Sequence, residues 1–150
     1  MRSPSDALVQ VNFSLYPGDV KRLESLVGEL RKKGVAVRRG TVLRGLIELT
    51  SATDMFAAAM LQHIDYKSKA GPRESDYQSS FAAVDLPQRL IDKLEGVIEV
   101  LAAKEVAANR SSIVRAMLRS APAGAQLALA FRQYLVDHPR KPRSDRTHRK

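Results

Sequence analysis

The sequence predicts a mostly helical protein that is built from two copies of one unit, each a short β-strand followed by three helices. Three observations support this prediction: an alternating apolar pattern typical of a strand, a change to helical spacing directly after it, and the recurrence of both further along the chain. With 150 residues, 44% of them hydrophobic, the chain can bury a core as one ordinary domain or as two very small ones.

The first strand is expected at residues 9–15, where apolar and polar side chains alternate. One face of such a strand needs a core and the other is free for polar partners. The apolar face carries Val9, Val11, Phe13 and Leu15, and the polar face carries Gln10, Asn12 and Ser14.

Three helices are expected after this strand. A turn at residues 16–19 leads into an amphipathic helix that is entered through Pro17 and ends near Gly34. A second helix is expected from about residue 39, and a third over residues 54–66, capped by Ser51 or Thr53. The apolar side of the third helix is expected to comprise Met55, Phe56, Met60, Leu61 and Ile64.

The second copy lies 71 residues after the first, as the alignment of Leu23 with Leu94 shows. The same offset needs no gap and also aligns Leu15 with Leu86, Glu24 with Glu95, Leu30 with Leu101, Arg39 with Arg110 and Arg44 with Arg115. It predicts a strand at 81–86, helices at 89–103 and after Asn109, and a last helix through Leu127, Leu129, Phe131, Tyr134 and Leu135. The expected units are therefore residues 1–71 and 72–138, followed by a disordered basic tail at 139–150.

Charge is the most informative bulk property of the chain. The formal net charge of +9 is concentrated in residues 1–49, with nine basic and five acidic residues, and in residues 139–150, with six and one. Such clustering favours a polyanionic partner. Because the chain has no cysteine and no apolar run as long as a membrane span, we expect a soluble cytoplasmic protein with no membrane partner.

Features of an enzyme are missing from the sequence. His63, His138 and His148 are scattered without metal-ligand spacing, and no glycine-rich phosphate loop or nucleophile motif is present. We therefore expect no catalytic residues, no metal site and no cofactor, and a binding protein that is not an enzyme.

The order of motifs in the second copy resembles the ribbon-helix-helix family of bacterial DNA-binding proteins. The resemblance is carried by Leu86-Pro87, by Leu90-Ile91 with Leu94, and by residues 109–118, and it covers roughly residues 8–49 and 80–120. It implies a tandem pair of ribbon-helix-helix units, each with an extra third helix. In that family, strands of two units pair antiparallel into a ribbon that enters the major groove, and the start of each second helix lies on phosphate.

The resemblance also implies positions of DNA contact. Gln10, Asn12 and Ser14 fall where the family reads base edges, and amide side chains suit adenine; the alternative is a solvated polar face. The second strand presents Phe81, Ala83 and Asp85, which are structural or which read a thymine methyl group through Phe81 or Ala83. Phosphate contacts are expected from Arg38, Arg39, Gly40, Thr41, Asn109, Arg110, Ser111 and Ser112, and weaker tail contacts from Arg140, Lys141, Arg143, Arg146, Arg149 and Lys150.

Each of the two helix starts, and the tail, has a simpler alternative to phosphate contact. Thr41 is a candidate N-cap of the first unit's second helix, and Asn109 or Ser111 of the second unit's, with each cap worth roughly 0.5 to 2 kcal/mol. The basic tail is alternatively a solubilising segment.

The resemblance implies sequence-specific binding to double-stranded DNA, as a transcriptional repressor or as a plasmid partition or conjugation accessory protein at the nucleoid or a plasmid. The alternative is an antitoxin-type protein-interaction module in which DNA binding is regulatory. Strand pairing within one chain and between chains both remain open. A homodimer is expected in either case, because operators are commonly palindromic.

Overall fold

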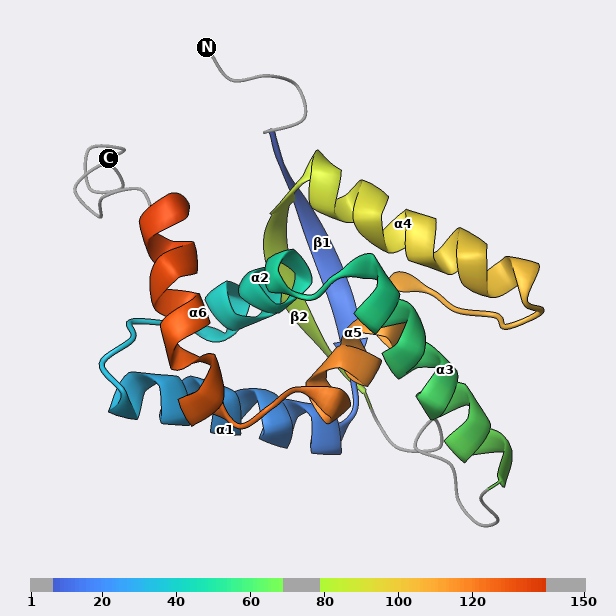
Figure 1. The fold of residues 1–150 in the computed structure, drawn as a ribbon, viewed down its shortest axis with the longest axis horizontal. Helices are drawn as coiled ribbons and strands as arrows, with labels where there is room; N and C mark the ends of the chain where they lie inside the picture. Colours follow the sequence, from blue (N-terminus) through green and yellow to red (C-terminus); the bar gives the residue numbers. More distant parts are fainter. Residues whose placement is uncertain (1–6, 69–78, 140–150) are drawn as a thin grey trace.

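The computed structural model describes residues 7–68 and 79–139, which form a two-stranded antiparallel sheet packed against helices (Figure 1). The expected mostly helical class is confirmed. In chain order the elements are β1 (Leu8–Leu15), α1 (Pro17–Lys32), α2 (Arg39–Leu49), α3 (Ala52–Ser68), β2 (Ser80–Pro87), α4 (Gln88–Ala103), α5 (Arg110–Ser120) and α6 (Gly124–Asp137).

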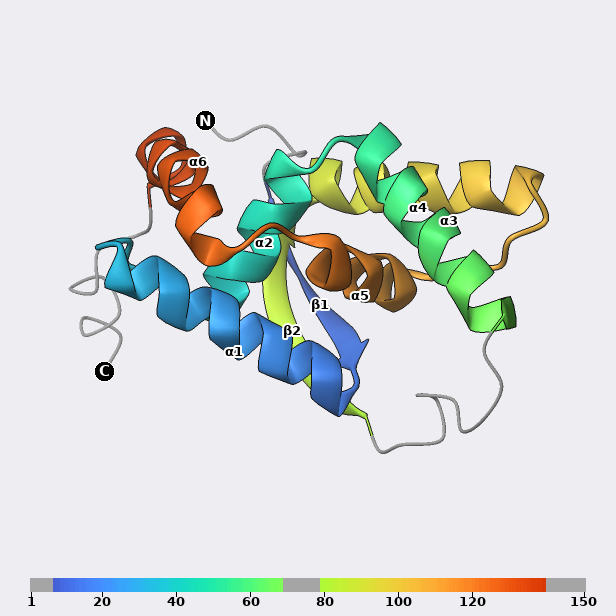
Figure 2. The same cartoon turned by 60° about the horizontal axis from the view of Figure 1, so that its bottom comes forward.

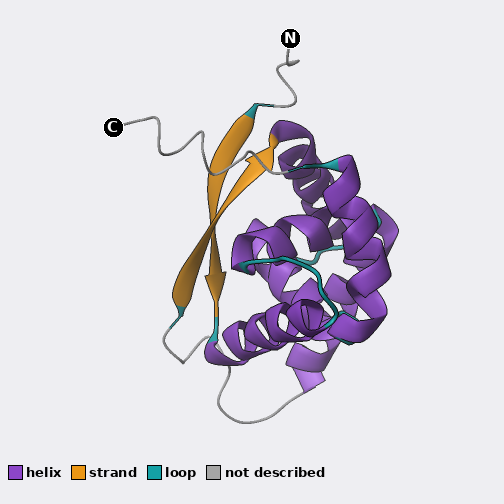
Figure 3. Ribbon diagram, turned by 90° about the vertical axis from the view of Figure 1, so that its left-hand side faces the viewer, coloured by secondary structure: helices purple, strands orange, loops and turns teal. Residues whose placement is uncertain are grey.

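The two strands form a twisted ribbon on one side of the molecule, and the helices lie on the other (Figure 3). β1 pairs with β2 along its whole length, with Leu8 opposite Pro87 and Leu15 opposite Ser80. The two copies of the unit therefore pair within a single chain. Each strand supplies the backbone hydrogen-bond partners along one edge of the other, so a second chain is not needed to pair the two strands.

The inward face of the ribbon covers the core, as the alternating pattern predicts for Val11, Phe13 and Leu15. The expectation is wrong for Val9, which lies near the end of the ribbon and is 41% exposed. Phe13, Leu15 and Leu86 are at most 1% exposed, and Val11 and Val84 are also buried. These side chains join buried residues of both copies in one continuous hydrophobic cluster. The apolar strand face and the helices therefore share a single core.

The third helix of each copy packs on the other copy. α3 lies against α4 and α5, whereas α6 lies against α1 and α2 (Figures 1 and 2). Phe131 of α6 fits against Gly45 of α2, where an added Cβ would lie 2.5 Å from the ring. Glu29 Oε2 accepts a 2.7 Å hydrogen bond from the N–H of Gly124 at the start of α6. The copies are thus interlocked.

The first helix of each copy ends in the same way. Gly34 (φ +82°) and Glu105 (φ +62°) follow the helices and are 71 residues apart. In both places the next N–H reaches back to a helix carbonyl, from Val35 to Leu30 at 3.0 Å and from Val106 to Leu101 at 2.9 Å. A left-handed residue favours glycine, so Glu105 takes a conformation that its side chain disfavours in order to keep this ending.

Two expectations about local structure are wrong. Of the segment expected as a turn at residues 16–19, only Tyr16 precedes α1, as its N-cap; the helix begins at Pro17, the expected entry residue, because proline's fixed φ suits the first helical position. Leu61 and Ile64 of α3 and Leu129 of α6 are 66%, 57% and 78% exposed instead of packed. α3 packs around Met55 and α6 around Phe131, and Ile64 and Leu129 fall on the opposite side of their helices.

The expected boundary between residues 71 and 72, and the tail beyond Pro139, lie outside the described residues. None of the helices in the described ranges is both long enough and apolar enough to cross a membrane.

Candidate nucleic-acid interface

The outward face of the ribbon combines different side chains from its two strands. Gln10 and Asn12 are exposed and Ser14 is partly exposed. On β2, Ala83 and Asp85 are exposed, and Phe81 is 75% exposed. The register places Gln10 opposite Asp85, Asn12 opposite Ala83 and Ser14 opposite Phe81. The polar face expected on β1 is therefore accessible, but its neighbour strand is chemically unlike it.

The start of α5 is capped by the residues that the sequence singles out. Asn109 Oδ1 accepts a 2.8 Å hydrogen bond from the N–H of Ser112, and Ser112 Oγ accepts one of 2.9 Å from the N–H of Asn109. The first bond within the helix runs from Ile113 N–H to Asn109 O. The N–H groups of Arg110 and Ser111 precede it, at the end of the helix where the dipole is positive.

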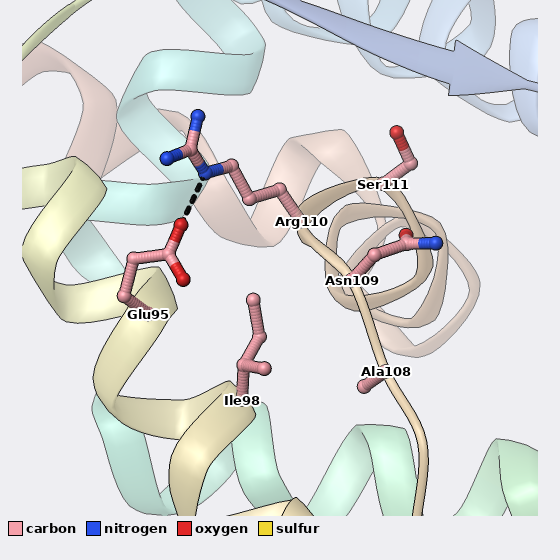
Figure 4. Close-up of a pocket in the computed structure, with 6 residues that line it drawn as sticks. All are labelled: Glu95, Ile98, Ala108, Asn109, Arg110 and Ser111. Atoms are coloured by element: carbon pink, nitrogen blue, oxygen red, sulfur yellow. Dashed lines mark hydrogen bonds and ion pairs between the residues drawn. The ribbon is translucent and has the colours of Figure 1, made fainter.

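An open pocket of about 390 Å³ lies beside this helix start and is lined by Glu95, Ile98, Ala108, Asn109, Arg110 and Ser111 (Figure 4). Arg110 Nε donates a 2.6 Å hydrogen bond to Glu95 Oε1, and the two side chains remain 41% and 44% exposed. The terminal nitrogens of Arg110 point away from Glu95 (Figure 4). Asn109, Arg110 and Ser111, which were expected on phosphate, therefore share one accessible concave surface.

The start of α2 matches this arrangement only in part. Arg39 forms an ion pair with Glu24, the equivalent of the pair between Arg110 and Glu95. The expected capping by Thr41 is wrong: Arg38 occupies the N-cap position without a side-chain cap, and Thr41 is 5% exposed. Because the helix begins at Arg39, Thr41 is its third residue and turns inward.

The backbone of the α2 start is nevertheless open. The first helical bond there is donated by Val42 N–H to Arg38 O. The N–H groups of Arg39, Gly40 and Thr41 come before this bond and therefore have no carbonyl partner within the helix. A Cβ added at Gly40 would meet no atom within 4 Å, so this turn can be approached closely.

Two further arginines, which were not among the expected contacts, fix the ribbon to the second helices. Arg115 Nη1 donates a 2.8 Å hydrogen bond to Ser14 O, and its guanidinium carbon lies 4.7 Å from the centre of the Tyr16 ring. Ser111 Oγ accepts a 2.8 Å hydrogen bond from the N–H of Ser14. Arg44 Nη1 reaches Asp85 O at 3.2 Å. The match of Arg44 with Arg115 across the repeat was the available sequence signal.

Next to Arg44 lies a cluster of polar and charged side chains, formed by Tyr134, Glu48, Arg89 and His138. Arg44 Nε donates to the Tyr134 hydroxyl at 3.1 Å, and burial raises the pKa of that hydroxyl. Arg89 donates two 2.6 Å hydrogen bonds to the carboxylate of Glu48 and thereby lowers its pKa. His138 Nε2 lies 3.2 Å from the same carboxylate. The cluster connects α2, α4 and α6 next to the ribbon.

Comparison of the chain with family models, curated proteins and solved structures gives no match. The six tail residues expected to touch DNA lie outside the described part of the chain. Among residues 7–68 and 79–139, no group of three or more histidine, cysteine or acidic residues is arranged to hold a metal ion. The ribbon and the two helix starts therefore constitute the candidate site.

Proposed function

We propose that this protein binds double-stranded DNA in a sequence-specific manner, with the β1–β2 ribbon inserted in the major groove. The observation that supports this proposal is the accessible polar face of β1, on a ribbon that the starts of α2 and α5 flank from the two copies. A major groove about 12 Å wide accepts a two-stranded ribbon. Under this proposal the chain contains two ribbon-helix-helix units and belongs to that family of DNA-binding proteins.

Base recognition is assigned to β1. The exposed amides of Gln10 and Asn12 each carry a donor and an acceptor, which can pair with N7 and N6 of adenine. Ser14 contributes a hydroxyl that donates or accepts. Its backbone is held at both N–H and C=O by Ser111 and Arg115, so the strand is presented in a fixed position. A reading surface that is rigid before binding loses less conformational entropy on binding.

Phosphate contacts are assigned to the two helix starts. Helix N-termini attract anions through unpaired N–H groups and the helix dipole. Arg39 and Arg110 add positive charge on exposed side chains, each positioned by a glutamate. A phosphate approaching either helix start would share the arginine with that glutamate. These contacts fix the register of the ribbon on the duplex without reading its sequence.

The proposed biological role is transcriptional repression, or an accessory role in plasmid partition or conjugation. Because a single chain completes the ribbon, one chain is the smallest unit that can read DNA. A homodimer would join two such chains, each of which occupies a site of its own on the DNA.

A second candidate function is an antitoxin-type protein-interaction module. The observation that favours it is the exposure of Leu61 and Ile64 on α3 and of Leu129 and Val136 on α6, each at least 57% exposed. Exposed apolar side chains on the added helices suit a protein partner, and DNA binding would then serve regulation.

Selection of duplexes from a random pool, followed by titration of an enriched duplex at several salt concentrations, tests the proposed function. The logarithm of the binding constant should fall with the logarithm of salt concentration, with a slope of about −0.9 for each phosphate contact. Deletion of residues 139–150 should flatten the slope and leave the sequence preference intact, because the tail contributes charge alone. A scrambled duplex is the matched control. A slope of zero for a bound duplex would exclude the proposal.

A further inference from the structure

The centre of the ribbon coincides with the axis that relates the two copies of the unit. Asn12 and Ala83 are equivalent positions of the repeat, 71 residues apart. They are also the residues that face each other across the two strands. A position can face its own equivalent only at a two-fold axis. The pair Asn12–Ala83 therefore marks that axis on the outward face of the ribbon.

The two ends of the outward face occupy equivalent positions of the repeat, but they carry different side chains. On one side of the axis Gln10 faces Asp85, and on the other Ser14 faces Phe81. The repeat makes Gln10 equivalent to Phe81 and Ser14 equivalent to Asp85. Two identical strands would give two identical ends. Here one end carries an amide and a carboxylate, and the other carries a hydroxyl and an exposed phenyl ring.

The framework beneath this face is symmetric. Arg44 and Arg115 hold the two strands, and the ion pairs Arg39–Glu24 and Arg110–Glu95 stand at the two helix starts. Each half thus offers phosphate one arginine and one helix start, although the neighbouring residues differ (Arg38, Gly40 and Thr41 in the first copy, Asn109, Ser111 and Ser112 in the second). The residues assigned to bases differ between the halves at all three positions. Phosphate contacts carry no sequence information, so polarity on DNA must come from the outward face of the ribbon.

We propose that one chain reads a non-palindromic duplex site in a single orientation. This inference rests on the proposed binding of DNA by the ribbon. At the first end, Gln10 pairs with adenine, and the carboxylate of Asp85, which can only accept, repels the O6 and N7 acceptors of guanine. Asp85 thus contributes to specificity by excluding guanine from this end of the site.

The second end suits thymine, because the Phe81 ring is 75% exposed and apolar side chains contact the C5-methyl group of that base. At the axis, Asn12 suits adenine and Ala83 suits a thymine methyl group, which are the two partners of one base pair. The predicted site therefore has an A·T pair at its centre, an adenine flank that rejects guanine, and a thymine flank.

The test compares duplexes selected by the full chain with those selected by a symmetrised variant. In that variant β2 receives the residues of β1 at equivalent positions, as Phe81→Gln, Ala83→Asn and Asp85→Ser. The unmodified chain should enrich a non-palindromic site, and sedimentation should give one chain for each duplex. The symmetrised variant should enrich a site whose two halves are inverted repeats. Circular dichroism before selection verifies that both proteins are folded.

Two single variants keep the inference testable if the triple variant does not fold. Gln10→Ala should reduce discrimination roughly 5- to 150-fold on one flank of the site only, and Phe81→Ala on the opposite flank only. Both side chains are exposed, so neither change opens the core. A palindromic site for the unmodified chain, or loss on both flanks with Gln10→Ala, would overturn the inference and leave the proposed function standing. Enrichment of no duplex at all would overturn the proposed function itself.

Discussion

Arg44 and Arg115 occupy the same position in the two copies of the unit, and each donates a hydrogen bond to a strand carbonyl of the other copy. Arg44 Nη1 lies 3.2 Å from Asp85 O, and Arg115 Nη1 lies 2.8 Å from Ser14 O. Asp85 and Ser14 are themselves equivalent in the repeat. The same type of hydrogen bond, from an arginine of one copy to a strand carbonyl of the other, therefore fixes the ribbon to the helices at both of its ends.

The first prediction concerns this contact. Arg115→Ala should lower the free energy of unfolding by about 1.5 to 3 kcal/mol, because it removes a charge-assisted hydrogen bond and leaves Ser14 O without its donor. Urea denaturation followed by circular dichroism measures the change. Lys21→Ala, an exposed substitution on α1, is the control and should change stability by less than about 0.5 kcal/mol. Equal stabilities of the two variants would show that the arginine does not hold the ribbon.

The second prediction concerns base recognition. Asn12→Ala should weaken binding to a selected duplex by roughly 1 to 3 kcal/mol and should leave binding to random DNA almost unchanged, because base contacts specify and phosphate contacts do not. Fluorescence anisotropy with both duplexes measures the difference.

Asp85→Ala is the matched control on the partner strand. It should not weaken binding to the selected duplex and should raise the affinity for random DNA, because it removes a negative charge that repels DNA and the acceptors of guanine in the groove. If Asp85→Ala removed the sequence preference and Asn12→Ala had no effect, the assignment of the reading strand would be reversed.

The sequence predicts most of the fold because the signals are local. Alternation marks β1, Pro17 marks the start of α1, and the 71-residue offset transfers both to the second copy. The partner of β1 is a long-range choice that no local pattern specifies, and the register that puts Asn12 opposite Ala83 needed the structure. The packed side of α3 was likewise not predictable. Helical spacing shows which apolar residues lie on one side of a helix, but not how many of them are covered by neighbouring elements.

Residues of the candidate site could be predicted from the sequence where the type of side chain and its position allow a single role. Asn109 caps α5 as its side chain suggests, and Gln10 is exposed as alternation requires. Thr41 was misjudged because the same hydroxyl serves as a cap or as a buried third residue, depending on where the helix begins. The match of Arg115 with Arg44 across the repeat marks the position, but its role was not predictable, because its partner is the backbone carbonyl of Ser14, which no residue type indicates.

The third prediction concerns acid stability. Hydrogen bonds from Arg89 lower the pKa of Glu48 below its ordinary value of 4.5. A depressed carboxyl pKa contributes stability that is present above about 4.5 and is lost as pH falls through the folded value. Glu48→Gln should therefore be less stable than the unmodified chain near neutral pH, and the difference should shrink in acid. Thermal unfolding at a series of pH values measures this, and an equal substitution at the more exposed Glu24 should have a smaller effect.

The fourth prediction concerns the fragment of residues 1–71, which contains β1 but not the strand that pairs with it. In this fragment Phe13 and Leu15 would lose the cover that both copies provide, and the backbone of β1 would lose its partners. α1 would also lose α6, and α3 would lose α4 and α5. The fragment should therefore be largely unfolded by circular dichroism.

Addition of the separate fragment of residues 72–150 should restore helical structure in a one-to-one complex, because every contact between the copies is then available again. Sedimentation and circular dichroism of the mixture measure this rescue. Residues 72–150 alone are the matched control and should be equally unstable, since β2, α4 and α5 lose their partners in the same way. A folded homodimer of residues 1–71 would show instead that β1 can pair with itself between chains. A folded monomer of that fragment would contradict both pairings and the tandem ribbon-helix-helix proposal with them.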